Sequence, residues 1–135
     1  MTLLFAYGSN MASSEMQAWC PDHRYLGPAR LDGFRIELRR RSIRWRGGAA
    51  DIVPAPGESV WGVVYEIADE ELDRLDQKEG EGFAYRRRSV KVEYEGERRA
   101  AVAYEVIDKE PDQVEPSPEY LDLLRAAARE RGLPR

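Results

Sequence analysis

The fold class is decided by the stretch Tyr85-Arg-Arg-Arg-Ser-Val-Lys-Val-Glu-Tyr94, which turns at Glu95-Gly96 into Arg98-Arg-Ala-Ala-Val-Ala-Tyr-Glu-Val-Ile107. Both arms alternate apolar and polar residues, so that Val90 and Val92 share one face. This alternation is typical of half-buried strands, and a short turn between two such arms predicts an antiparallel hairpin. The core of the protein is therefore expected to be a sheet built largely from strands that follow one another.

Further strands are predicted on the N-terminal side of this hairpin. They are an apolar segment at Thr2–Tyr7, an alternating segment at Phe34–Arg39, a short run at Ala49–Val53 and a run rich in β-branched and aromatic residues at Val60–Ile67. Gly47-Gly48 is expected to break the chain, and Pro54-Ala-Pro-Gly57 is expected to form a turn.

Three helices are predicted around these strands: Met11–Trp19, Asp69–Lys78 and a C-terminal helix that starts after Ser117-Pro118 and ends at Gly132. Serine followed by proline is typical of a helix start, and glycine of a helix end. Six or seven mostly consecutive strands with about three helices predict an α+β fold: a small, mostly antiparallel β-barrel flanked by helices. Residues 1–135 are expected to form a single domain because no linker or repeat divides them.

Composition excludes several classes of protein. The chain has 135 residues, 42% hydrophobic and 34% charged, and a formal net charge of −4, which gives no overall attraction to nucleic acid. One cysteine cannot form an internal disulfide framework, and no apolar run reaches the length of a membrane span. The first residues lack the charged lead and long apolar stretch of a signal peptide. We expect a cytoplasmic protein without membrane or nucleic-acid partners.

A candidate anion site follows the first predicted strand. Tyr7-Gly8-Ser9-Asn10 connects that strand to a helix, and backbone N–H groups at such a turn can converge on an anion. Gly8 allows close approach to the backbone, and Ser9 adds a hydroxyl donor. The long glycine loop and lysine of a nucleotide site are missing, so a small carboxylate fits better. An ordinary capped turn is the simpler interpretation of this short pattern.

An acidic segment provides a candidate general base. Asp73, Asp76, Glu79 and Glu81 lie close together in sequence, and such clusters are usually solvated. Glu79 stands at the end of a predicted helix, however, where a negative charge opposes the helix dipole. A carboxylate that is crowded or partly buried there can take up a proton near neutral pH, as a general base must.

Other chemistry has little support. His23 is the only histidine and Cys20 the only cysteine, so the sequence holds no histidine or cysteine cluster for a metal. A Cys20–His23 thiol pair is conceivable but unusual at such short spacing. The tyrosines cannot be ranked from the sequence, since most buried tyrosines pack their rings and satisfy their hydroxyls.

The motifs together resemble the γ-glutamylcyclotransferase family, which includes the AIG2-like proteins. The resemblance runs in one order along most of the chain: Phe5-Ala-Tyr-Gly-Ser-Asn10, Ala29-Arg-Leu-Asp-Gly-Phe34, Gly47-Gly48-Ala49, Ile52 through Pro56-Gly57, Val60-Trp-Gly-Val-Val-Tyr65, Leu75-Asp76 with Glu79-Gly80, Pro116-Ser-Pro-Glu-Tyr120 and Gly132-Leu-Pro134. Each motif is weak alone. Their order and spacing make the signal specific.

This resemblance implies a function and a site. The family cyclises a γ-glutamyl group to 5-oxoproline, releases the attached amino acid or amine and needs no cofactor or metal. The resemblance implies that Glu79 is the catalytic residue. It implies that the substrate is bound by Tyr7, Gly8, Ser9, Asn10, Tyr85 and Tyr120. The resemblance does not determine the group attached to the γ-glutamyl moiety, which can be an amino acid, the rest of glutathione, an ε-amine or a biosynthetic amine. It also leaves open whether the protein forms a homodimer.

Two alternatives remain at this point. The first is a barrel that binds small molecules or RNA without catalysis, since small barrels often bind oligonucleotides and Arg39–Arg41 with Arg86–Arg88 could line a phosphate-binding stripe. The second is a cyclotransferase that removes a γ-glutamyl protecting group from a biosynthetic metabolite. The basic segment Arg39–Arg46 could also border the pocket and favour acidic substrates, although a solvated loop is the simpler interpretation.

Overall fold

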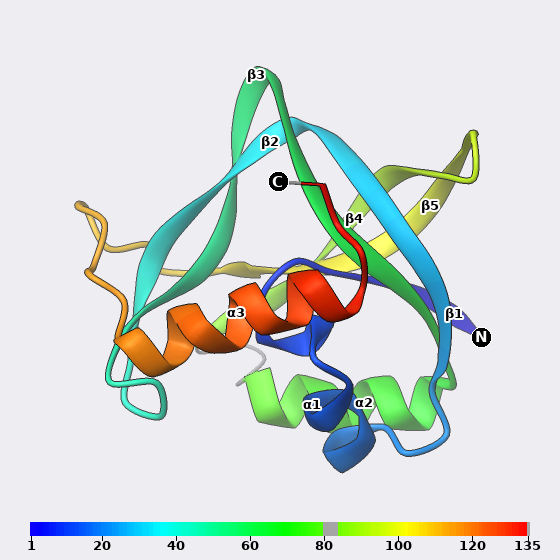
Figure 1. The fold of residues 1–135 in the computed structure, drawn as a ribbon, viewed down its shortest axis with the longest axis horizontal. Helices are drawn as coiled ribbons and strands as arrows, with labels where there is room; N and C mark the ends of the chain where they lie inside the picture. Colours follow the sequence, from blue (N-terminus) through cyan, green and yellow to red (C-terminus); the bar gives the residue numbers. More distant parts are fainter. Residues whose placement is uncertain (80–83, 135) are drawn as a thin grey trace.

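A closed β-barrel forms the centre of the protein in a computed structural model that describes residues 1–79 and 84–134. Its strands are β1 (Thr2–Ala6), β2 (Arg24–Ser42), β3 (Gly47–Ile67), β4 (Tyr85–Tyr94) and β5 (Glu97–Val106). They follow the order β1-β3-β2-β4-β5 around the barrel (Figure 1). The predicted α+β fold with a small barrel is confirmed.

Neighbouring strands are antiparallel at every pairing except the one that closes the barrel. The β4–β5 hairpin runs from Tyr85 opposite Val106 to Tyr94 opposite Glu97, as predicted. The closing pair is parallel and joins Leu4 of β1 to Val102 of β5. β1 therefore pairs with β3 on one side and with β5 on the other.

The prediction of six or seven strands is wrong by count, because the structure describes five. β2 and β3 are long strands of 19 and 21 residues that bend without leaving the sheet. Their pairing shifts register near Gly27 and Gly33, both of which have positive φ. Irregularities of this kind bend a strand and disrupt the ladder only locally. The strands continue past them, so the predicted turn at Pro54–Gly57 lies inside β3.

Gly47-Gly48 begins β3 and does not break the chain. A Cβ at Gly48 would stand 2.0 Å from the carbonyl oxygen of Val114, and the Gly48 N–H donates to the Glu115 carbonyl at 2.9 Å. Glycine is needed there because the segment that leads to the last helix crosses directly over the strand.

Helices follow β1, β3 and β5 along the chain and pack against the barrel. A short 3₁₀ turn, η1 (Ser9–Met11), precedes α1 (Ser13–Trp19), and these are followed along the chain by α2 (Asp69–Glu79) and α3 (Pro118–Glu130). Ser117 caps α3 by accepting a hydrogen bond from the Tyr120 N–H at 3.2 Å, which confirms the predicted start and fixes Tyr120 in the first turn. Figure 1 shows α3 across the barrel, with α1 and α2 together on one side.

Two hydrophobic clusters share the alternating residues of β1. Phe5 and Tyr7 face the barrel interior with Ile52, whereas Leu4 and Ala6 face the layer between barrel and helices. Tyr7 therefore enters one end of the barrel, and the turn that follows it lies at the junction of barrel and helices.

In the described ranges, no helix is long and apolar enough to cross a membrane.

Candidate active site

A small pocket of about 40 Å³ lies where β1 ends. It brings together all seven residues assigned to the site from the sequence: Tyr7, Gly8, Ser9, Asn10, Glu79, Tyr85 and Tyr120. Ala50 and Tyr104 line it as well, and neither was assigned to the site from the sequence. The signals that pointed to them were the Gly47-Gly48-Ala49 motif beside Ala50 and the unranked tyrosines.

The turn after β1 is held in place through its carbonyl groups. The Tyr65 hydroxyl donates to the carbonyls of Asn10 at 2.7 Å and Met11 at 3.1 Å, and Arg131 donates to Met11 at 3.1 Å. Helical turns leave their first N–H groups without an internal acceptor. The amides of Ser9 and Asn10 at the start of η1 therefore have no acceptor within the turn.

Gly8 keeps the pocket open. A Cβ at this position would lie 3.5 Å from both the Ala50 Cβ and the Tyr120 hydroxyl oxygen. That spacing is ordinary van der Waals contact, so a side chain would fit against the protein but would fill pocket space. The absence of a side chain at Gly8 therefore keeps the pocket accessible.

Glu79 ends α2 and points at the side chain of Asn10. The Asn10 Nδ2 donates to the Glu79 Oε1 at 2.8 Å, and the Glu79 side chain is 14% exposed. Asn10 was expected to offer its backbone; its side chain proves to be the partner that orients Glu79. A contact between residues 69 positions apart leaves no local pattern in the sequence.

Lys78 adds a positive charge beside this pair. Its Nζ donates to the Asn10 Oδ1 and lies 3.2 Å from Glu15 Oε1 and 3.7 Å from Glu79 Oε1. With a side chain only 7% exposed, Lys78 is a buried cation matched to two carboxylates. The Asn10 amide is fixed from both sides, since its oxygen accepts from Lys78 and its nitrogen donates to Glu79.

The tyrosines of the pocket are fixed through backbone groups. Tyr7 donates to the Tyr104 carbonyl at 2.5 Å, Tyr85 donates to the Ala50 carbonyl at 2.9 Å, and the Tyr120 hydroxyl accepts from the Ala50 N–H at 2.8 Å. Burial raises the pKa of Tyr7 and Tyr85, and it raises the pKa of Tyr120 to about 12 against the lowering effect of the Ala50 N–H. All three hydroxyls stay protonated near neutral pH.

The acidic cluster of the sequence divides into two parts. Asp76 accepts from the Tyr104 hydroxyl at 2.5 Å and from Arg87 at 2.9 Å and 2.5 Å, and Asp73 accepts from Arg87 at 3.1 Å. These carboxylates are thus occupied on the side of α2 that faces β4 and β5, and Glu79 is the member that reaches the pocket. Glu81 lies outside the described residues.

Most arginines of the two basic runs are paired with carboxylates, whereas Arg40 and Arg41 have no such partner among the described residues. Arg86 and Arg88 donate to Glu105 at 3.0 Å and 2.8 Å, and Arg39 donates to Glu37 at 2.6 Å. A phosphate-binding stripe needs several free cationic side chains on one surface, and the pairing of most of these arginines weakens the alternative of an RNA-binding barrel. Across residues 1–79 and 84–134, no group of three or more His, Cys, Asp or Glu side chains is arranged to hold a metal ion.

Comparison with known proteins agrees with this geometry. Residues 4–122 match the family described as "Gamma-glutamyl cyclotransferase, AIG2-like". Two proteins named gamma-glutamylcyclotransferase, from Bos taurus and Homo sapiens, are each 34% identical to the chain over 138 residues, covering 98% of this chain and 72% of the relative. The chain belongs to the γ-glutamyl cyclotransferase, AIG2-like family. The resemblance inferred from the motifs is confirmed.

Solved structures extend the match to three dimensions. One described as "Gamma-glutamyl cyclotransferase" superposes with a TM-score of 0.92 at 32% identity, covering 98% of this chain and 81% of that one. A yeast γ-glutamyl cyclotransferase specific to glutathione superposes with a TM-score of 0.64 at 18% identity, covering 99% and 91% of the two chains. The second comparison concerns the fold alone.

Proposed function

We propose that this chain is a γ-glutamylcyclotransferase that converts a γ-glutamyl compound into 5-oxoproline and a free amine, with Glu79 as the general acid and base. The observation that carries the proposal is the convergence of Glu79 and the turn Gly8–Asn10 on one pocket, with the Asn10 side chain 2.8 Å from the carboxylate. Membership of the γ-glutamyl cyclotransferase family supports the same activity.

The turn is assigned to the α-carboxylate of the substrate. Backbone N–H groups at the start of η1 suit this anion, and the absence of a side chain at Gly8 leaves room for it in the pocket. Binding at this point places the adjacent α-amine near Glu79, and the rest of the glutamyl chain lies among Tyr7, Tyr85 and Tyr120.

Ring closure then follows from proton transfer. The substrate's α-ammonium cannot attack until it loses a proton, and Glu79 accepts that proton. The freed amine adds to the γ-carbonyl carbon to form the ring C–N bond. Glu79 returns the proton to the leaving nitrogen as the original amide C–N bond breaks, and the ring nitrogen loses its second proton, which the released amine takes up to leave as an ammonium. No proton is gained or lost overall.

The protein's main contribution is geometric. The nucleophile and the carbonyl belong to one molecule, and holding them in a reactive orientation can supply roughly 7–11 kcal/mol of the barrier. The fixed tyrosine hydroxyls and the Asn10 amide keep the pocket walls and Glu79 from rearranging. Preorganised groups of this kind stabilise a transition state without a reorganisation cost.

The test is Glu79→Gln, measured as 5-oxoproline release from a panel of γ-glutamyl compounds by mass spectrometry. Glutamine keeps the shape of the side chain and cannot accept the proton, so we expect a loss of about 10²–10⁴-fold with an unchanged melting temperature. Glu70→Gln is the matched control, because Glu70 lies on the same helix and is exposed. Substantial turnover by Glu79→Gln would rule out this assignment of Glu79.

A further inference from the structure

A second, larger pocket adjoins the first. It has a volume of about 380 Å³ and shares four residues with the inner pocket, namely Ser9, Glu79, Tyr85 and Tyr120. Its outer wall comes from the end of β2 and the turn that follows: Arg40, Ser42, Ile43, Arg44 and Trp45. Glu79 lines both pockets, so the outer pocket adjoins the point at which an amine protonated by Glu79 would be released.

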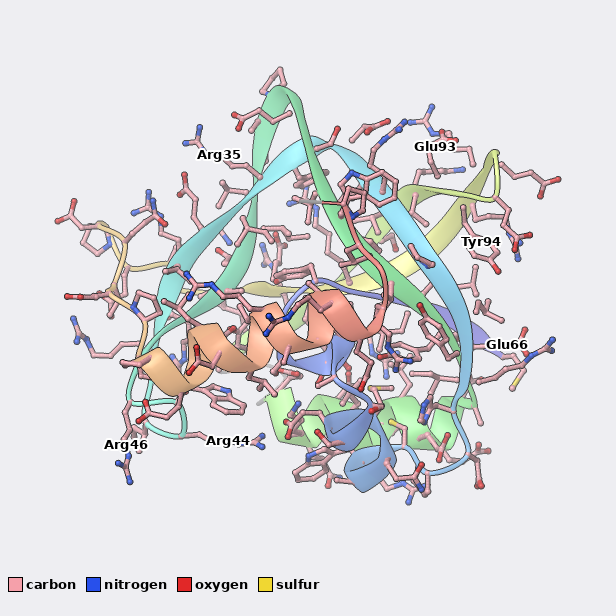
Figure 2. The ribbon with its side chains drawn as sticks, in the orientation of Figure 1. Arg35, Arg44, Arg46, Glu66, Glu93 and Tyr94 are labelled. Carbon is pink, nitrogen blue, oxygen red and sulfur yellow. The ribbon has the colours of Figure 1, made fainter. Side chains whose placement is uncertain are left out.

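Two of the cations in the outer pocket already have partners. Arg44 donates to Glu15 at 2.9 Å and its guanidinium lies 4.5 Å from the centre of the Trp45 ring. Lys78 contacts Asn10 and both Glu15 and Glu79, as described above. Figure 2 shows Arg44 and Arg46 projecting from the turn between β2 and β3. These contacts account for the charges of Arg44 and Lys78.

Arg40 differs from both. Within the described ranges it has no hydrogen-bond or ion-pair partner, although its side chain lines the pocket and the residue is half-buried. Its strand neighbour Arg39 is engaged with Glu37 at 2.6 Å, whereas Arg41 is exposed and does not line this pocket. A guanidinium that is partly removed from water gains from an anionic partner.

Arg40 lies beside the wall that the two pockets share. It pairs across β2 and β3 with Ala49, the residue before the Ala50 backbone that Tyr85 and Tyr120 hold. Burial raises the pKa of Tyr85, and the charge of Arg40 acts in the opposite direction on the same hydroxyl. Arg40 is therefore electrostatically coupled to the wall that the two pockets share.

We propose that Arg40 is a specificity-determining residue that binds a carboxylate carried by the leaving amine. The substrates of this chain are then γ-glutamyl amino acids or peptides whose leaving group has a free carboxylate near the scissile bond, and simple γ-glutamyl amines are poor substrates. This inference rests on the proposed function, since it assigns the outer pocket to the leaving group. A bidentate guanidinium–carboxylate contact provides the specificity.

The experiment compares γ-glutamyl-alanine with γ-glutamyl-alaninamide, which differ in the negative charge of the leaving group. We expect the wild-type protein to prefer the acid by about 10–100-fold in kcat/KM, as for a charge-assisted hydrogen bond. Arg40→Gln should lose this preference through a fall on the acid alone, with the amide unaffected. Arg41→Gln, which removes the same charge from the neighbouring exposed position, should keep the wild-type preference.

Equal kcat/KM on the two compounds with the wild-type protein, or a preference that survives Arg40→Gln, would overturn the assignment of Arg40. Calorimetric binding of γ-glutamyl-alanine to Glu79→Gln, with and without Arg40→Gln, separates this result from the proposed function. A tenfold or greater loss of affinity on adding Arg40→Gln supports the carboxylate contact, whatever the turnover results. A failure of the protein to release 5-oxoproline would contradict only the proposed cyclisation. Equal affinity removes the contact and leaves the cyclisation to be judged from turnover.

Discussion

Asn10→Ala tests how much of the activity depends on the orientation of Glu79. The substitution removes an amide that donates to the Glu79 Oε1 at 2.8 Å and accepts from Lys78. A hydrogen bond to a charged group contributes about 1.5–3 kcal/mol. If that free energy is expressed in the transition state, kcat/KM falls about 10- to 150-fold. The backbone carbonyl of Asn10 keeps its bond from Tyr65, so the turn itself should survive.

The assay is initial 5-oxoproline release across substrate concentration, with the melting temperature measured on the same samples. We expect the loss in kcat, because Asn10 acts on Glu79 through its side chain. Ser13→Ala is the control, since Ser13 is exposed on α1 and contacts Glu130 at 3.3 Å, away from the pocket. A kcat within about threefold of wild type would refute the reasoning, and a change confined to KM would make Asn10 a substrate contact instead.

Three further predictions concern the scaffold, each measured as the free energy of unfolding in urea. Tyr120→Phe leaves the buried Ala50 N–H without its acceptor at 2.8 Å and should cost about 1–3 kcal/mol; no loss would mean that the amide finds another partner. Gly48→Ala places a Cβ 2.0 Å from the Val114 carbonyl oxygen and should destabilise by about 1–3 kcal/mol or more; wild-type stability would show that the crossing segment moves freely. Burial raises the pKa of Glu105, but hydrogen bonds from two arginines of β4 outweigh it and hold the pKa below the ordinary 4.5, so Glu105→Gln should cost about 1.5–3 kcal/mol at pH 7. That difference should shrink as the pH falls below 4.5 and through the lower folded pKa; a difference that grows on acidification would reverse the sign of the argument.

Short sequence patterns correctly predicted the elements that are determined by residues close together in the sequence. Alternation predicted the β4–β5 hairpin, and Ser117-Pro118 predicted the start of α3. The number of strands was predicted wrongly because glycine and proline mark a bend and a break alike. At Gly33 and Gly57 the positive φ values of 85° and 84° accompany a register shift between two strands that continue on both sides of it, and only the partner strand reveals which case holds.

The residues of the site were predictable as a set, but their contacts were not. The structure brings Glu79 and the turn after Tyr7 to one pocket, and the roles that the motifs assign to them stay predictions. The structure adds contacts made by the Asn10 side chain, Lys78 and the backbone of Ala50. These contacts join segments that are distant in sequence, so they produce no periodic pattern. The cytoplasmic location, the homodimer and the absence of nucleic-acid partners stay predictions from the sequence.

The closure of the barrel governs when the pocket can exist during folding. Tyr7, at the end of the first strand, is anchored on the carbonyl of Tyr104, 97 positions later, and β1 pairs with β5 through Leu4 and Val102. Contacts this far apart reward the chain only after the entropy of a long loop has been lost. During synthesis, β1 can pair with β3 before β5 is made, but the barrel cannot close until β5 is present. A chain stalled or cut before β5 contains the turn's sequence without its geometry, so the ability to release 5-oxoproline reports a completed barrel.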